Sequence, residues 1–193
     1  NCKIKKNIGI IGDRIFAFAK DLDLEQAKLF EKSPAERKGK WNKVLTLKNS
    51  PALNKYNFIF KDEKLTLTFK DNEILSIDIN QSTEREALSN KISELESSLK
   101  QPITLMKNDA FPFFDTSISK KVDFVNSVSL LNFQSINDFE KKVGKKIETS
   151  IFRGNICIDG LEPWKEREWI GKTIKINNVS FKVEKNIPRC VAI

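Results

Sequence analysis

Residues 151–164 read Ile-Phe-Arg-Gly-Asn-Ile-Cys-Ile-Asp-Gly-Leu-Glu-Pro-Trp, and the rest of the chain is interpreted around this stretch. Its alternating pattern predicts a strand at 151–158, and two further strands are expected at 173–176 and 179–183. Polar residues that stand singly on this β-structure indicate a functional site rather than a core. They are Arg153, Asn155 and Cys190.

The remainder of the chain is predicted to be mostly β-structure with two helices. Regular alternation at 56–60, 65–69 and 75–79 predicts an antiparallel meander with one buried face. A long helix is expected at 84–99, and a shorter one from Ser135 to Gly144. Three phenylalanines either line a substrate mouth or, as we expect, close the end of a barrel. These are Phe111, Phe113 and Phe114.

The composition is that of an ordinary globular protein. The 193 residues are 39% hydrophobic and 31% charged, which argues against disorder. No apolar run approaches the roughly 20 residues of a membrane span, so we expect no membrane partner. Three cysteines are too few, and odd in number, for a disulfide framework, so a reducing, cytoplasmic location is expected. The absence of histidine excludes Ser-His-Asp and Cys-His catalysis and histidine-ligated metal sites.

The net charge of +8 makes an anionic partner plausible. The lysines are scattered at strand ends and turns and do not gather on one helix face, and no aromatic-basic motif of an RNA-binding sheet is visible. Nucleic acid is therefore not the expected partner. A basic binding module without a cofactor stays open as an alternative, and strong, salt-dependent affinity for RNA or DNA would indicate it.

The C-terminal motifs resemble those of the MOSC family, named for the C-terminal domain of molybdenum cofactor sulfurase. The segments that carry the resemblance are Phe152-Arg153-Gly154-Asn155, residues 159–164, Glu168-Trp169-Ile170-Gly171 and Pro188-Arg189-Cys190. Within that family the amidoxime-reducing type is the most similar. Residues 12–16, which contain Arg14, and residues 45–53 look like the β-barrel domain that precedes MOSC in such proteins.

The resemblance implies a mostly β (α+β) fold with two β-barrel-like domains. A MOSC N-terminal-like barrel would span residues 1–82, a connecting helix and strand 83–107, and the MOSC barrel 108–193. It also implies that the chain is cut short at both ends and lacks the last strands of the second barrel.

The resemblance further implies a molybdenum–pyranopterin cofactor with Cys190 as the protein ligand to molybdenum. A soft thiolate suits that metal, whose charge would keep the thiol deprotonated. Arg153, Asn155 and Arg14 fall on cofactor- or anion-binding positions of the family. A guanidinium fits a phosphate through two parallel hydrogen bonds. From the residues alone, Arg14 also fits a solvated strand end and Cys190 a buried structural thiol, while Cys157 is expected to be inert.

Two positions depart from the family pattern. Lys48 stands where an arginine is usual, which would replace a bidentate contact by a single one. Ser127 lies in a stretch, residues 123–127, that differs from the usual small polar residues and proline, so its role as a cofactor contact is a weaker expectation.

The function implied is a molybdenum-dependent oxidoreductase that reduces N-hydroxylated small molecules by oxygen-atom transfer. No flavin or iron–sulfur motif is present, so the electrons would come from a flavin, iron–sulfur or cytochrome protein or from a further C-terminal domain. Pyridoxal phosphate binding is a term applied to the family in general, and the resemblance implies it at that level only. The alternative function is a sulfur carrier that holds a persulfide on Cys190.

Overall fold

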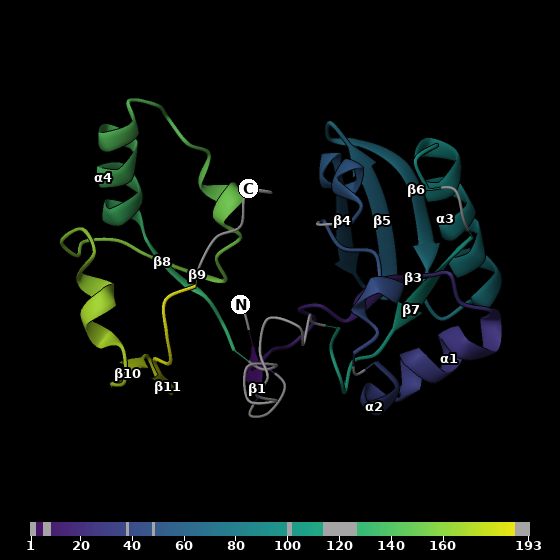
Figure 1. The fold of residues 1–193 in the computed structure, drawn as a ribbon, viewed down its shortest axis with the longest axis horizontal. Helices are drawn as coiled ribbons and strands as arrows, with labels where there is room; N and C mark the ends of the chain where they lie inside the picture. Colours follow the sequence, from purple (N-terminus) through teal and green to yellow (C-terminus); the bar gives the residue numbers. More distant parts are fainter. Residues whose placement is uncertain are drawn as a thin grey trace. The chain divides into compact units, whose positions relative to one another are not determined.

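A computed structural model describes residues 3–5, 9–37, 39–47, 49–99, 102–113 and 127–187 of the chain. The chain divides into two compact units, residues 1–126 and 127–193. Figure 1 shows that each unit has its own helices and strands. The domain boundaries expected from the sequence stay a prediction.

Three antiparallel strands form the sheet of the first unit: β4 (Tyr56–Lys61), β5 (Lys64–Phe69) and β6 (Asn72–Asp78). Tyr56 lies opposite Phe69, and Leu65 lies opposite Ile77. The turn between β4 and β5 is made by Asp62 and Glu63, with φ values of 51° and 59°, which match the twist of a tight hairpin. The predicted meander is confirmed.

Helix α3 (Ser82–Leu95) and the antiparallel pair β3 (Phe16–Lys20) and β7 (Ile103–Lys107) complete the main core. Leu88 and Ile92 of α3 are fully buried and pack in the same cluster as the apolar side chains of β5 and β6. The helix ends at Leu95, earlier than the predicted residue 99, because Glu96 leaves the helical conformation. Its buried carboxylate accepts hydrogen bonds from Tyr56 Oη at 2.8 Å and Lys55 Nζ at 2.5 Å.

A second cluster of buried side chains lies under helices α1 (Leu24–Lys32) and α2 (Pro34–Arg37). Helix α1 begins with a capping box in which Asp23 Oδ1 accepts from Gln26 N at 2.8 Å. Phe113, which is 5% exposed, belongs to this cluster, whereas Phe111 is 53% exposed. Phe113 therefore fills the core of an α/β layer and not the end of a barrel, and Phe114 lies outside the described residues.

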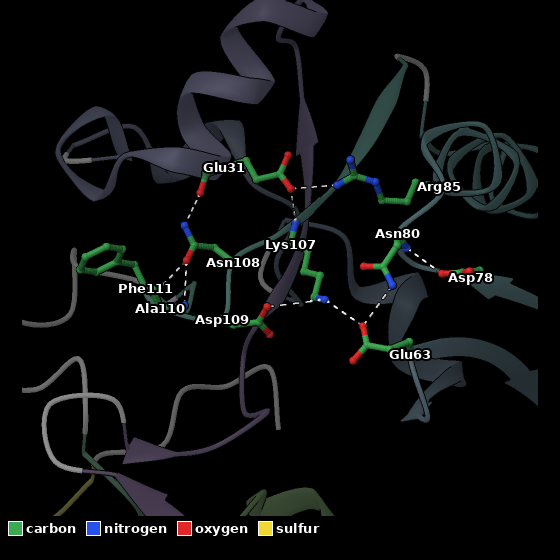
Figure 2. A network of polar contacts seen from close by, with 10 residues as sticks. All are labelled: Glu31, Glu63, Asp78, Asn80, Arg85, Lys107, Asn108, Asp109, Ala110 and Phe111. Carbon is green, nitrogen blue, oxygen red and sulfur yellow. Dashed lines mark hydrogen bonds and ion pairs between the residues drawn. The ribbon is translucent and has the colours of Figure 1, made fainter.

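A network of polar contacts, drawn in Figure 2, links these elements. Glu31 Oε1 of α1 accepts from Arg85 Nη1 of α3 at 2.8 Å and from the backbone N of Lys107 in β7 at 3.2 Å. Lys107 Nζ lies 3.2 Å from Glu63 Oε2 and 3.5 Å from Asp109 Oδ2. Because each of these charges has an opposite partner, we interpret the network as structural.

The second unit is built on two parallel strands, β8 (Leu130–Asn132) and β9 (Ile156–Ile158), joined through helix α4 (Phe133–Val143). This is a βαβ unit. Helix α4 starts two residues before the predicted Ser135, because Asn132 Oδ1 accepts from Gln134 N at 3.1 Å. Gly144 ends it with φ 68°, as predicted. An antiparallel hairpin follows, formed by β10 (Thr173–Ile176) and β11 (Val179–Lys182).

The strand predicted at 151–158 is shorter in the structure. Residues Thr149–Phe152 form the 3-10 helix η4, and only Ile156–Ile158 are in β9. The reason is Arg153, whose φ of 48° is left-handed and cannot continue a strand. Five smaller elements are also present in the described residues. They are the pair β1 (Ile4–Lys5) and β2 (Gly9–Ile10), and the 3-10 helices η1 (Trp41–Lys43), η2 (Pro51–Lys55) and η5 (Lys165–Trp169).

The fold over the described residues is mixed α/β, with four α-helices and several small sheets. Each sheet has two or three strands, and none of those described closes into a barrel, so the two-barrel prediction is not confirmed. The mostly-β expectation fails at β8 and β9, which pair in parallel through a helix and not as a hairpin. None of the helices described is long and apolar enough to cross a membrane.

Candidate functional site

The Arg153–Asn155 segment is anchored to Ser129, the residue before strand β8. The backbone N of Asn155 lies 3.1 Å from Ser129 O and 3.1 Å from Ser129 Oγ, and the backbone N of Ile156 donates to Ser129 O at 2.9 Å. These contacts hold the segment at the N-terminal end of the parallel pair β8–β9. Ser127, also predicted to be part of the site, precedes Ser129 by two residues and is exposed.

The Asn155 side chain has a defined orientation. Its Oδ1 accepts from the backbone N of Ser129 at 3.0 Å and from Ser129 Oγ at 3.0 Å. A backbone N–H only donates, so the atom that faces it is the amide oxygen. The Nδ2 group therefore points away from Ser129, and it makes no hydrogen bond within the described part of the chain. An exposed amide in this position offers two N–H donors to a ligand.

Arg153, two residues before Asn155 in the sequence, is exposed and carries a guanidinium. It caps η4 with φ 48°, and its backbone N donates to Ser150 O at 2.9 Å. No acidic side chain in the described residues pairs with it. Gly154 lets the segment approach β8 closely, since an added Cβ would lie 2.4 Å from Leu131 Cδ1. The arrangement can bind an anion or another acceptor-rich group.

The loop of residues 159–169 docks on the first two turns of α4, at the opposite end of the two strands. Ser135, which is buried, donates through Oγ to Glu166 Oε1 at 2.7 Å and accepts from Trp164 N at 2.7 Å. Trp164 Nε1 donates to Asp138 Oδ2 at 2.6 Å. Trp164 is thus held to α4 through both its backbone and its indole.

Acidic groups of this loop region are held in their ionised form. The pKa of Asp138 is lowered by its hydrogen bond with Lys142 and then by that with Trp164. The pKa of Asp159 is lowered by hydrogen bonds from Gln134 and from the backbone of Gly160. Carboxylates that are already hydrogen-bonded in this way are poor candidates for acid–base work near neutral pH.

Arg14 belongs to the first unit. It precedes β3 with φ 57°, its Nε donates to Asp13 Oδ2 at 2.8 Å, and its carbonyl accepts from Phe113 N at 2.7 Å. Its backbone is thus fixed against the second core cluster, and its guanidinium is paired with the neighbouring aspartate. The assignment of Arg14 to the site stays a prediction.

Two predicted site residues, Lys48 and Cys190, lie outside the described residues, and their roles stay predictions. The neighbour of Lys48, Asn49, lines a pocket of about 220 Å³ together with Lys20, Ser50 and Ile103. Cys157, which the sequence predicts to be inert, is exposed on β9, and its inertness stays a prediction. The described residues contain no group of three or more cysteines and carboxylates that could hold a metal ion.

The structure adds Ser129 to the predicted set, a residue that the sequence analysis missed. A serine before a short strand carries no distinguishing pattern, and its partner lies 26 residues further along the chain. Ser129 would be found by looking for a serine or threonine just before β8, the strand that pairs in parallel with β9 after the Arg-x-Asn segment. Such a search requires the parallel pairing of β8 and β9, which only the structure supplies.

Comparison with known proteins gives two findings. Residues 121–193 match the family model described as MOSC domain. Over 84 residues the chain is 29% identical to mitochondrial amidoxime reducing component 2 of Bos taurus, and this covers 44% of the chain and 24% of that relative. The chain thus matches about a quarter of the length of the curated relative. Both findings show similarity to MOSC-domain proteins and to the amidoxime reducing component, and the resemblance seen in the sequence is confirmed.

Proposed function

We propose that this chain, through its MOSC-matching residues, binds a molybdenum–pyranopterin cofactor and works as an oxidoreductase that reduces N-hydroxylated compounds. The observation that carries the proposal is the pair of exposed donors, the Arg153 guanidinium and the Asn155 amide, on a segment clamped to Ser129. This segment lies inside residues 121–193, which match the MOSC domain. The name of the bovine relative states that it reduces amidoximes, which are N-hydroxylated.

The donor set fits the phosphate side of such a cofactor. A guanidinium and an amide NH2 both donate to phosphate oxygens, and a guanidinium does so bidentately. The carboxylates of Asp159 and Glu166 bond to α4 residues at the other end of the strands and would not repel a phosphate beside Arg153. The residues present therefore fit the anionic part of the group.

The remaining roles are assigned by the family pattern and are part of the proposal. Cys190 would hold the molybdenum through its thiolate, and Arg14, Lys48 and Ser127 would add contacts to the cofactor. When bound, the cofactor supplies the two-electron redox chemistry for oxygen-atom transfer. The protein would orient the cofactor and neutralise its phosphate, and a separate electron-donor protein or domain would supply reducing equivalents.

The test is the molybdenum and pterin content of the chain purified from a host that makes the cofactor. Wild type is expected to hold molybdenum and pterin in equal amounts. Arg153→Ala should hold less, and Cys190→Ala should lose molybdenum. Lys182→Ala is the matched control, because this basic residue of the same unit forms an exposed ion pair with Glu184. A wild-type protein without pterin contradicts the proposal, and a sulfur adduct on Cys190 in that protein would favour the sulfur carrier.

A further inference from the structure

We propose that Ser129 is a positioning residue of this site, which fixes the Asn155 amide so that its NH2 group faces a hydrogen-bond acceptor of the bound ligand. The inference rests on the proposed cofactor site and deepens it, because it assigns the donor and the acceptor of one hydrogen bond between Asn155 and the ligand. The ligand atom that meets Asn155 is then an acceptor, such as a phosphate oxygen or a ring carbonyl, and not a donor.

The backbone of Ser129 fixes the orientation of the Asn155 side-chain amide. The backbone N of Ser129 lies 3.0 Å from Asn155 Oδ1. If the amide were flipped, its NH2 would face an N–H group, and two donors would oppose each other. The backbone contact thus selects one of the two orientations of the amide.

The Ser129 hydroxyl makes two contacts with Asn155. Its Oγ lies 3.0 Å from Asn155 Oδ1 and 3.1 Å from Asn155 N. One hydroxyl can donate to the amide oxygen and accept from the backbone N–H of the same residue. The carbonyl of Arg153, at 3.5 Å, is a poorer acceptor for the same proton. Ser129 thus holds the backbone and the side chain of Asn155 at once.

These contacts determine which group Asn155 offers to a ligand. With Oδ1 occupied by two donors, the amide cannot rotate to offer its oxygen outward without losing both contacts. Asn155 is therefore preorganised as a donor, and the entropy of ordering its side chain is lost on folding and not on binding. Removal of the hydroxyl would leave only the backbone contact and should allow the side chain to sample other rotamers.

Four variants separate positioning from folding. Ser129→Ala removes the hydroxyl, and Ser129→Thr keeps one. Asn155→Asp keeps the acceptor oxygen for Ser129 but replaces the outward donor by a carboxylate oxygen. Ser150→Ala removes an exposed hydroxyl of the preceding helix η4 that donates to Glu148, and it serves as the control. The dispersion of backbone amide resonances reports whether each variant is folded.

The experiment has two readouts on the 193-residue chain. The side-chain amide resonances of Asn155 are recorded in the cofactor-free chain, and the release rate of bound cofactor is followed by the fluorescence of oxidised pterin. Ser129→Ala should shift and broaden the Asn155 amide resonances and speed cofactor release about fivefold, the loss expected for one hydrogen bond. Ser129→Thr and Ser150→Ala should match wild type, and Asn155→Asp should release cofactor fastest.

The outcomes separate this inference from the proposed function. If wild type retains cofactor but Ser129→Ala leaves both the Asn155 resonances and the release rate unchanged, Ser129 is not a positioning residue and the proposed function still stands. Release from Asn155→Asp at the wild-type rate would show that the amide does not face an acceptor. A wild-type chain that takes up no pterin would overturn the proposed function and this inference with it.

Discussion

Arg37 is the most heavily bonded buried charge in the described part of the first unit, and its replacement by methionine is a severe test of how that unit is held together. The side chain is 3% exposed and stacks on Phe113, with its Cζ 4.0 Å from the ring centroid. It donates to the carbonyls of Phe30 at 2.6 Å, Glu31 at 2.7 Å and Phe111 at 2.7 Å. Two of these carbonyls belong to the last turn of α1, which has no further helical N–H to satisfy them.

Arg37→Met keeps an apolar stem over Phe113 but leaves the carbonyls of Phe30 and Phe111 without this donor, while the Glu31 carbonyl keeps its bond from Asn108 Nδ2. Burial lowers the pKa of Arg37 to about 10, so the guanidinium is charged at neutral pH and its hydrogen bonds are charge-assisted. Each such bond is worth about 1.5–3 kcal/mol when charged, and water reaches some of the freed carbonyls, so we expect a total loss of about 3–4 kcal/mol.

The assay is urea unfolding of the first unit, followed by amide hydrogen exchange of β7 and α1. With a slope of about 2 kcal/mol per molar urea, the midpoint should fall by about 1.5–2 M. Arg85→Met is the matched control, because Arg85 is a partly exposed arginine that pairs with Glu31 and should cost less than about 1 kcal/mol. A midpoint shift no larger than that of the control would refute the role assigned to Arg37.

Three further predictions concern other elements. The pKa of Glu96 is lowered, chiefly by the hydrogen bond from Lys55. Its contribution to stability is therefore present above the unfolded pKa of 4.5 and is lost as the pH falls through the lower pKa of the folded state. Glu96→Gln should flatten the acid side of the stability–pH curve, and an unchanged acid side would contradict this prediction. Ser135→Ala should destabilise the second unit by about 1–3 kcal/mol in thermal unfolding, because it removes the hydroxyl that bonds to the half-buried Glu166 carboxylate and to the backbone N of Trp164. Gly144→Ala should cost about 1 kcal/mol in the same assay, since Gly144 has φ 68°, and no loss would mean that the helix end rearranges.

The sequence was sufficient for the parts of the fold that depend on local pattern. The meander of β4, β5 and β6 was predicted because strict alternation and tight turns are encoded within about 25 residues. The end of α4 was predicted because Gly144 is a helix C-cap signal. These features need no knowledge of distant partners.

Features that depend on long-range contacts were missed. The end of α3 is set by Glu96, whose partner Tyr56 is 40 residues away. The 151–158 segment alternates like a strand, yet a left-handed Arg153 breaks it so that Asn155 can bond to Ser129. In the candidate site, residue types and motif spacing identified Arg153 and Asn155, while Ser129 required the parallel pairing of two short strands.

The central claim is that Cys190 holds molybdenum in a cofactor whose anionic side meets Arg153 and Asn155. X-ray absorption at the molybdenum K-edge, on the chain purified from a cofactor-producing host, tests this claim most directly. We predict one sulfur neighbour fewer around molybdenum in Cys190→Ser than in wild type, with the pterin retained. Identical sulfur coordination in the two proteins, or no molybdenum in the wild type, would contradict the account.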